Sequence, residues 1–257
     1  MRSIPRPVTL LSLALLCVSP ASAGLTYSAH MDKAGKDSYF QVWATDDKAK
    51  FVVENSEDPS MPPGLTIIAS DRGEQITLIA DQKQAYFQLS RDEYKRLLKG
   101  KAAQEELQID NSELEELVVD EDSVTIAGYP TRHYKIKISL TAREAGKTSN
   151  LVALEEFWTA PSIPNAARYL NMLTQQTSGI DKLDVLLDYQ KLKGLPLKRT
   201  VEIYINGEFA GRSLVEITKV GQSSVPESVF QVPVGYKKLE IPGQAPPSSE
   251  TDSVQRP

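Results

Sequence analysis

The chain has 257 residues, of which 40% are hydrophobic and 25% charged, with a net charge of −5 and a single cysteine. These figures are typical of a globular protein that is long enough for one substantial core or two small ones. The acidic balance argues against nucleic acid as a partner, because phosphate binding needs a basic stripe on the protein.

Residues 1–23 have the pattern of a secretory signal peptide. Two arginines precede a short apolar run, and the small residues at 21–23 follow it as a cleavage site. Cleavage near Ala23-Gly24 would place the protein in the periplasm and would take two positive charges from the net charge of −5, which gives −7. Lipidation of Cys17 is the alternative, although two leucines precede this cysteine where a lipoprotein signal needs a small residue.

The chain after the predicted cleavage site contains no cysteine. This excludes disulfides, a thiolate nucleophile and thiolate metal sites. No later apolar stretch approaches the ~20 residues of a membrane helix, so we expect that the protein is not an integral membrane protein.

Hydrophobic and polar residues alternate between residues 25 and 89, in short runs with turn-forming residues between them. This pattern is typical of an antiparallel meander. It predicts strands over residues 38–43, 50–54, 64–69, 76–80 and 85–89.

The periodicity changes near Ser90. Ser90 and Glu93 match a capping box, and the apolar residues that follow are spaced as on a helix, which predicts a helix over 91–107. A second capping-box pattern at 112–115 predicts a short helical turn within an acidic insertion near 105–122.

Strand patterns return in the second half of the chain. They predict strands over residues 122–127, 131–140, 149–158, 197–205 and 210–219. Asn206-Gly207 joins the last two as a hairpin turn. A second amphipathic helix is expected over 164–177, capped by Asn165, and residues 243–257 are expected to form a disordered tail.

Together these elements predict a single domain over residues 24–242 of the mainly β (α+β) class. About ten or eleven strands would form one large curved antiparallel sheet, or half-open barrel, because a sheet of this length tends to curl. The two helical insertions, near 91–107 and 164–177, would pack on its concave face.

Four stretches resemble motifs of bacterial exported proteins of unknown function: VTIAGYPTRHY at 124–134, FWTAPSIP at 157–164, GLPLK at 194–198 and VPESVFQVPVGY at 225–236. The resemblance implies a fold similar to the half-open barrel of the periplasmic lipoprotein carrier and its outer-membrane receptor, the LolA/LolB-like fold. The carrier shelters acyl chains in an apolar cavity. Lipoprotein transfer by this chain is an analogy from fold alone.

The sequence predicts no catalytic residue, no metal site and no cofactor, and hence a protein that is not an enzyme. His30 and His133 lack the spacing of zinc ligands, so we expect both on a solvated strand face. The acidic run at 120–122 lacks the glycine of an EF-hand loop, and no G-x-S-x-G motif occurs. A hydrolase that uses a buried carboxylate pair is the third hypothesis for function.

The large apolar side chains either fill a core or line a ligand cavity between sheet and helices. The candidates for the cavity are Trp43, Phe51, Tyr86, Phe87, Leu97, Phe157, Trp158, Tyr169 and Leu173. The first hypothesis is therefore an exported periplasmic binding protein for a lipid or acylated hydrophobic ligand. The alternative is a cell-envelope protein–protein interaction module with a filled core, whose partner docks on the sheet edge or on the acidic insertion near 105–122.

Overall fold

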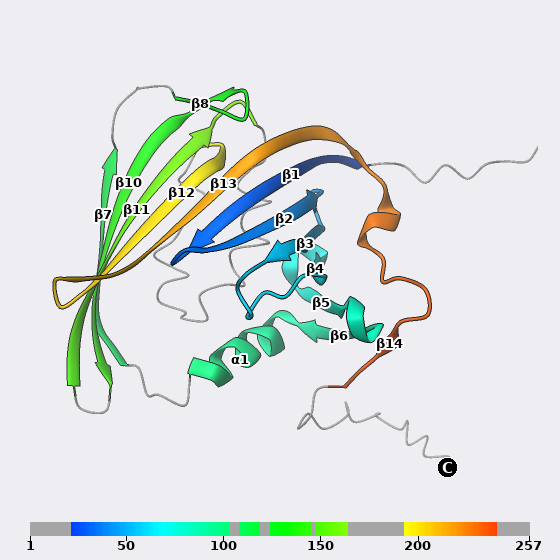
Figure 1. The fold of residues 1–257 in the computed structure, drawn as a ribbon, viewed down its shortest axis with the longest axis horizontal. Coiled ribbons are helices and arrows are strands. Elements are labelled where there is room, and N and C mark those ends of the chain that lie inside the picture. Colours follow the sequence, from blue (N-terminus) through cyan, green and yellow to red (C-terminus); the bar gives the residue numbers. More distant parts are fainter. Residues whose placement is uncertain (1–21, 103–107, 119–123, 145–146, 164–192, 241–257) are drawn as a thin grey trace, which may run out of the picture.

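The computed structural model describes residues 22–102, 108–118, 124–144, 147–163 and 193–240 (Figure 1). Predictions for residues 1–21 and for the helix at 164–177 lie outside these ranges, as do the acidic run 120–122 and the whole predicted tail at 243–257.

The first half of the chain is the predicted meander. Its strands are β1 (Ser22–Lys33), β2 (Lys36–Ala44), β3 (Ala49–Ser56), β4 (Leu65–Ser70), β5 (Gln75–Ala80) and β6 (Ala85–Ser90). Each strand pairs antiparallel with the next. Ala34 and Gly35 both have positive φ, as the tight β1–β2 turn requires, and short 3₁₀ turns at Asp71–Gly73 and Asp81–Lys83 make two later connections.

Helix α1 (Arg91–Ala102) follows β6 directly. Its N-terminus has the predicted capping box: the backbone N–H of Ser90 donates to the Glu93 carboxylate at 2.7 Å, and the N–H of Glu93 donates back to the Ser90 hydroxyl at 3.3 Å. Tyr94 packs against the sheet. None of the described helices is long and apolar enough to cross a membrane.

The second half of the chain contributes longer strands. These are β7 (Gln108–Val118), β10 (Arg132–Glu144), β11 (Lys147–Ala160), β12 (Leu195–Ile205) and β13 (Glu208–Val225), with a small separate hairpin of β8 (Thr125–Ile126) and β9 (Tyr129–Pro130). Asn206 and Gly207, both with positive φ, form the predicted β12–β13 turn. A 3₁₀ turn, η4 (Glu227–Phe230), and the short strand β14 (Lys237–Lys238) end the described chain.

Residues 108–118 form a strand, so the predicted helical turn at 112–115 and the helical character of the 105–122 insertion are wrong for these residues. Pairing with β10 sets Glu113 and Glu115 on the same face as the lysines of that strand, and Lys137 lies 3.6 Å from Glu115. Cross-strand charge pairs and the backbone ladder outweigh the local helix signal here.

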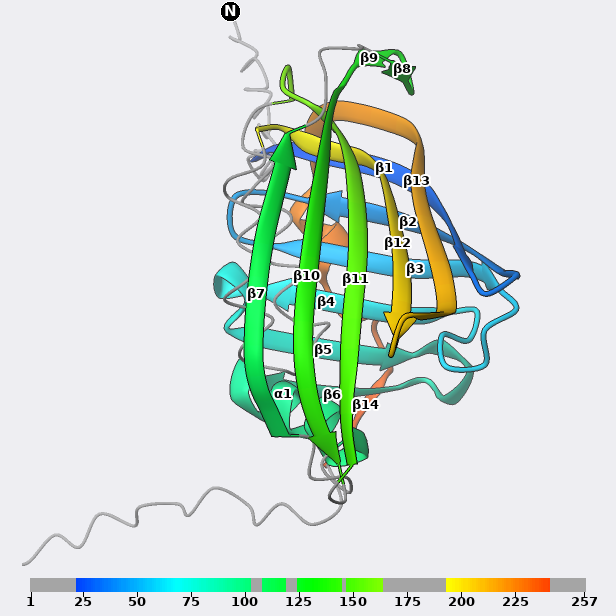
Figure 2. The ribbon, with the colours of Figure 1, turned by 90° about the vertical axis from the view of Figure 1, so that its left-hand side faces the viewer.

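Twelve strands form one sheet in the order β14-β6-β5-β4-β3-β2-β1-β13-β12-β11-β10-β7. Pairing of β1 with β13 joins the two halves, and the whole is antiparallel except for β14 against β6. The sheet is strongly curved, so β7 and β10–β12 cross in front of β2–β6 in Figure 2. Its ends, β14 and β7, are not paired with each other, which confirms the predicted curved, unclosed sheet of a mainly β fold.

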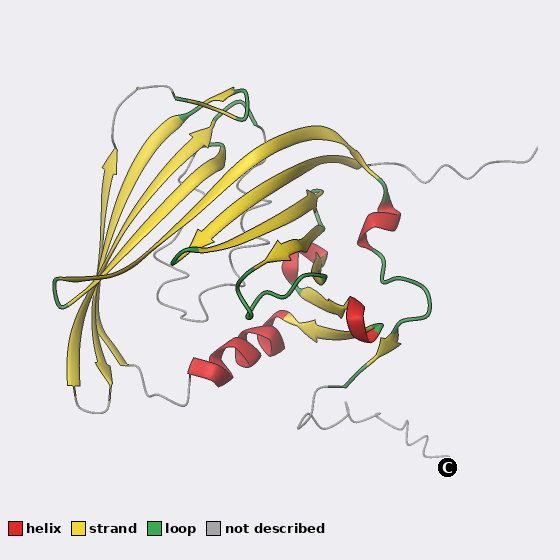
Figure 3. Ribbon diagram, viewed as in Figure 1, coloured by secondary structure: helices red, strands yellow, loops and turns green. Residues whose placement is uncertain are grey.

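We call the concave face, against which α1 packs, the inner face and the opposite face the outer face. Helical structure is sparse beside the strands in the described chain (Figure 3). The inner face carries the largest described hydrophobic cluster, while the outer face of β2–β6 is covered by residues 226–239, which we call the C-terminal strap. Both faces of this half of the sheet therefore carry buried residues.

Candidate functional site

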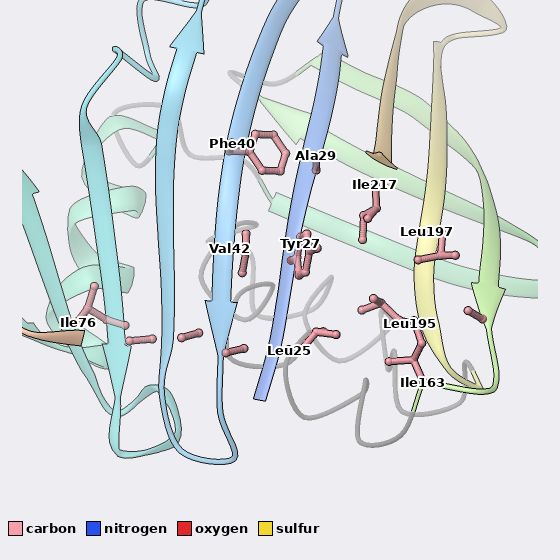
Figure 4. Close-up of a cluster of buried hydrophobic side chains, with 14 of the residues drawn as sticks. Leu25, Tyr27, Ala29, Phe40, Val42, Ile76, Ile163, Leu195, Leu197 and Ile217 are labelled. Atoms are coloured by element: carbon pink, nitrogen blue, oxygen red, sulfur yellow. The ribbon is translucent and has the colours of Figure 1, made fainter. Parts of the chain in front are cut away.

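Alternation along the strands places a continuous set of apolar side chains on the inner face. On β1 the odd-numbered residues from Leu25 to Met31 point inward, and their neighbours on β2 and β13 do the same. Buried members of this cluster are drawn in Figure 4, among them Leu25, Val42, Ile76, Ile163, Leu195, Leu197 and Ile217. They come from both halves of the sheet.

Tyr27 is a polar group within this apolar cluster. Only 8% of the residue is exposed, and burial raises the pKa of its hydroxyl well above the ordinary value. Its cross-strand neighbours are Val42 and Val220. Within the described chain the hydroxyl makes no hydrogen bond, although a buried Tyr hydroxyl usually finds a partner.

Two further tyrosines lie on the inner face. Tyr94 of α1 packs against the same cluster, and burial raises the pKa of its hydroxyl, but the residue is only partly buried. Tyr134 of β10 is buried beside Phe157. Neither hydroxyl has a hydrogen-bond partner among the residues that the structure describes. Tyr27 differs from both because it lies within the largest cluster.

A buried ion pair lies farther along the inner face, on β11 and β12. Nε and Nη2 of Arg199 donate to one oxygen of Glu155 at 3.2 and 2.9 Å, and the side chain of Glu155 is only 5% exposed. The guanidinium also lies 5.5 Å from the centre of the Phe157 ring. The two opposite charges neutralise each other within an otherwise apolar surface.

The described inner face is apolar apart from a few polar groups, chief among them the Tyr27 hydroxyl and the Glu155–Arg199 pair. A phenol that stays protonated can donate one hydrogen bond, and the ion pair adds no net charge. In the described ranges, no group of three His, Cys, Asp or Glu side chains could hold a metal ion.

Three of the predicted cavity residues lie on the inner face. Phe51 packs against the cluster with its ring centre 4.9 Å from that of Phe40, and Phe157 is 1% exposed. Phe87 pairs with Leu78, a residue of the same cluster. Leu97 is on α1 but is 45% exposed, whereas Tyr169 and Leu173 lie outside the described residues.

Three other candidates are on the outer face, so they do not line the space between sheet and helix. Trp43 and Tyr86 pack with the C-terminal strap, around Phe230. Trp158 lies between the ring of His133, stacked at 4.3 Å, and the Lys198 ammonium, 5.0 Å from its ring centre. The prediction assumed one buried face, but the strap and these stacked groups cover apolar side chains on the other.

Both histidines lie partly buried on the outer face. Nε2 of His30 is 2.8 Å from the Asp37 carboxylate, and that of His133 is 2.8 Å from the Glu156 carboxylate. Each ring stacks on an aromatic ring of the neighbouring strand, His30 on Tyr39 at 4.9 Å. The carboxylate partner of His133 comes from the next strand, which sequence spacing could not reveal.

Sequence reasoning also missed Tyr27 and the Glu155–Arg199 pair. A signal for Tyr27 was present, because it occupies an inward position in the alternation Leu25, Tyr27, Ala29. The sequence carries no signal for the ion pair, since its partners are 44 residues apart and meet only through the β11–β12 register.

Comparison with known proteins identifies the family but no activity. No curated protein matches this sequence. A solved structure, "The complex structure of Pseudomonas aeruginosa MucA/MucB", is similar at 11% identity over 81% of this chain, with a TM-score of 0.38. This chain spans about half (55%) of the length of that chain. Residues 29–236 match the model of a domain of unknown function, DUF4412, and because this match spans most of the chain, the protein belongs to that family.

Proposed function

We propose that this protein is an exported, non-enzymatic binding protein that shelters a lipid or acylated ligand on the inner face of its sheet. The observation that carries the proposal is the apolar inner face, which continues across both halves of an unclosed sheet. Such a face binds a ligand through buried apolar area, at roughly 25 cal/mol per Å². A LolA/LolB-like carrier would use its concave face in the same way.

Two exposed aliphatic side chains on β11 and β12, one on each face of the sheet, allow the proposed function to be distinguished from its alternative. Ile203 is on the inner face opposite Ala153 and is 36% exposed; Leu154 is on the outer face opposite Glu202 and is 37% exposed. Both can be made polar without opening the core. The two variants, Ile203→Ser and Leu154→Ser, therefore test one face each.

The measurement is displacement of a fluorescent fatty acid from the purified protein, with lipid extraction and native mass spectrometry of the protein as isolated. We expect Ile203→Ser to weaken binding about fivefold, as the loss of a half-buried aliphatic side chain implies, and Leu154→Ser to leave it unchanged. Equal effects of both variants, or no binding by the unaltered protein, would contradict the proposal.

Export is part of the proposal and rests on residues 1–23. Cleavage near Ala23-Gly24 would leave the β1 ladder from Gly24 to Lys33 complete. N-terminal sequencing of the protein from a periplasmic fraction should begin near Gly24. Recovery of the uncut chain from the cytoplasm would contradict it.

An envelope protein–protein interaction module is the second candidate function. It is favoured by exposed apolar side chains at the tip of the β12–β13 hairpin, where Phe209 is 60% and Ile205 43% exposed. This tip lies at the far left of Figure 1. Phe209→Ser should then reduce recovery of a co-purifying envelope protein, while Val234→Ser, at a fully exposed strap position, should not. Equal recovery with both variants would argue against this candidate.

A further inference from the structure

The hydroxyl of Tyr27 is buried in the inner-face cluster without a hydrogen-bond partner in the described parts of the chain. Removing a hydroxyl from water costs free energy unless a new hydrogen bond replaces the lost one. A phenylalanine would fill the same space at no such cost. The tyrosine at this position therefore indicates a polar partner that the described residues do not supply.

The positions around Tyr27 are hydrocarbon. Val220 faces it from β13. Val42 faces it from β2, and Leu25 and Ala29 flank it on β1 (Figure 4). This environment is chemically compatible with an apolar chain, of which the hydroxyl would meet a single polar atom.

The polar atom must be a neutral acceptor. Burial keeps the phenol protonated, so it can donate a hydrogen bond. A carboxylate at this place would lie among hydrocarbon side chains, and an uncompensated buried charge is costly. The inner-face cation Arg199 lies farther along the sheet and already holds the Glu155 carboxylate. An ester or amide carbonyl accepts the bond without bringing a charge.

We propose that the inner face binds a neutral acyl ester or amide, whose carbonyl oxygen accepts a hydrogen bond from the Tyr27 hydroxyl. This inference rests on the proposed function and names the chemical class of its ligand. It distinguishes esterified or amidated acyl chains from free fatty acids.

The test compares a C16 fatty acid with its methyl ester, each displacing a fluorescent apolar dye at pH 8 from the full-length protein. The unaltered protein should bind the ester more tightly than the acid. Tyr27→Phe should weaken ester binding about tenfold, the worth of one buried hydrogen bond, and leave the stability of the ligand-free protein equal or higher. Tyr39→Phe, the same change at an exposed outer-face position, is the matched control and should change neither the affinity for the ester nor the stability of the ligand-free protein.

Each other outcome has a definite meaning. Preference for the free acid, or an unchanged ester affinity in Tyr27→Phe, overturns the inference while leaving the proposed function intact. A loss of ligand-free stability in Tyr27→Phe without loss of ester affinity means that an internal water holds the hydroxyl, which also overturns it. If neither the dye nor either ligand binds, the proposed function itself fails.

Discussion

At the scale of single residues, the Glu155 carboxylate depends on Arg199 for its charge balance. The carboxylate is almost fully buried, and both donors of the guanidinium converge on one of its oxygens. Removing one partner of such a pair leaves an uncompensated charge, whereas replacing both by apolar groups is close to neutral. We therefore expect Arg199→Met to lower the free energy of unfolding by about 3 kcal/mol, measured by urea denaturation.

The double variant Glu155→Leu/Arg199→Met should recover most of this loss. Arg212→Met is the control, because Arg212 lies 4.0 Å from Glu202 in a largely exposed pair that should contribute little. If the double variant is as unstable as Arg199→Met alone, the pair stabilises the protein by packing rather than by charge.

Gly194 is fixed by a close backbone approach. Its φ is +103°, and a Cβ at this position would lie 2.2 Å from the carbonyl oxygen of Ala160, at the end of β11. Gly194→Ala should lower the free energy of unfolding by more than about 2 kcal/mol, because it adds a backbone clash to a conformation that disfavours side chains. The readout is the midpoint of urea unfolding.

Gly207 provides the comparison, since its φ is +85° but a Cβ would meet nothing within 4 Å. Gly207→Ala should cost only about 1 kcal/mol, from conformation alone. Equal losses for the two variants would mean that the contact with Ala160 is not what requires glycine at position 194.

At the scale of elements, the C-terminal strap is a structural part of the sheet. Its Phe230 is 9% exposed and packs with Ile68, Ile79 and Val225 on the outer face. The Tyr236 hydroxyl donates to Asp81 at 3.0 Å, and backbone N–H groups of the strap donate to carbonyls on and beside β6. The strap thereby covers an edge strand that would otherwise be open to pairing.

Phe230→Ala should therefore destabilise the protein by about 3 kcal/mol, as expected for truncating a buried aromatic side chain. Thermal unfolding followed by circular dichroism would report the change. Val234→Ala, at a fully exposed position of the same strap, should stay within about 0.5 kcal/mol of the unaltered protein. A similarly small effect of Phe230→Ala would show that packing of the strap on the sheet contributes little to the stability of the protein.

Local signals predicted most elements of the first half, because each strand there pairs with its sequence neighbour across a short turn. The capping box at Ser90 and the Asn206-Gly207 turn are equally local, and both are present. The sequence predicted β7 wrongly, since its strand form depends on a partner in β10, and it missed the strap because its contacts with β2–β6 are distant in sequence. The ion pair at Glu155 escaped prediction for the same reason, whereas alternation along β11 alone places Trp158 on the face opposite Phe157.

At the scale of the whole molecule, the pairing of β1 with β13 joins the first meander to the strands of the second half. This seam brings residues about 190 positions apart into register, and it makes one curved sheet of two sequence regions. The apolar inner face continues across the seam through Tyr27 and Ile217. Buried residues of both halves therefore pack together across the seam.

Hydrogen exchange tests this organisation directly. Strand β1 is paired on both sides from Leu25 to Lys33, and β13 is paired on both sides at residues 213–216, whereas β7 is an end strand paired only with β10. Amides of residues 25–33 in β1 and 213–216 in β13 should therefore exchange slowest, through global unfolding, and the outward amides of β7 should exchange fastest among the strands, through local opening. Mass spectrometry of exchanged peptides from the ligand-free protein would give the order. Uniform protection across β7 and β1 would mean that the sheet opens only as a whole. Slower exchange in β7 than in β1 would mean that the most stable unit is formed by β7 and β10–β12 rather than by the β1–β13 seam.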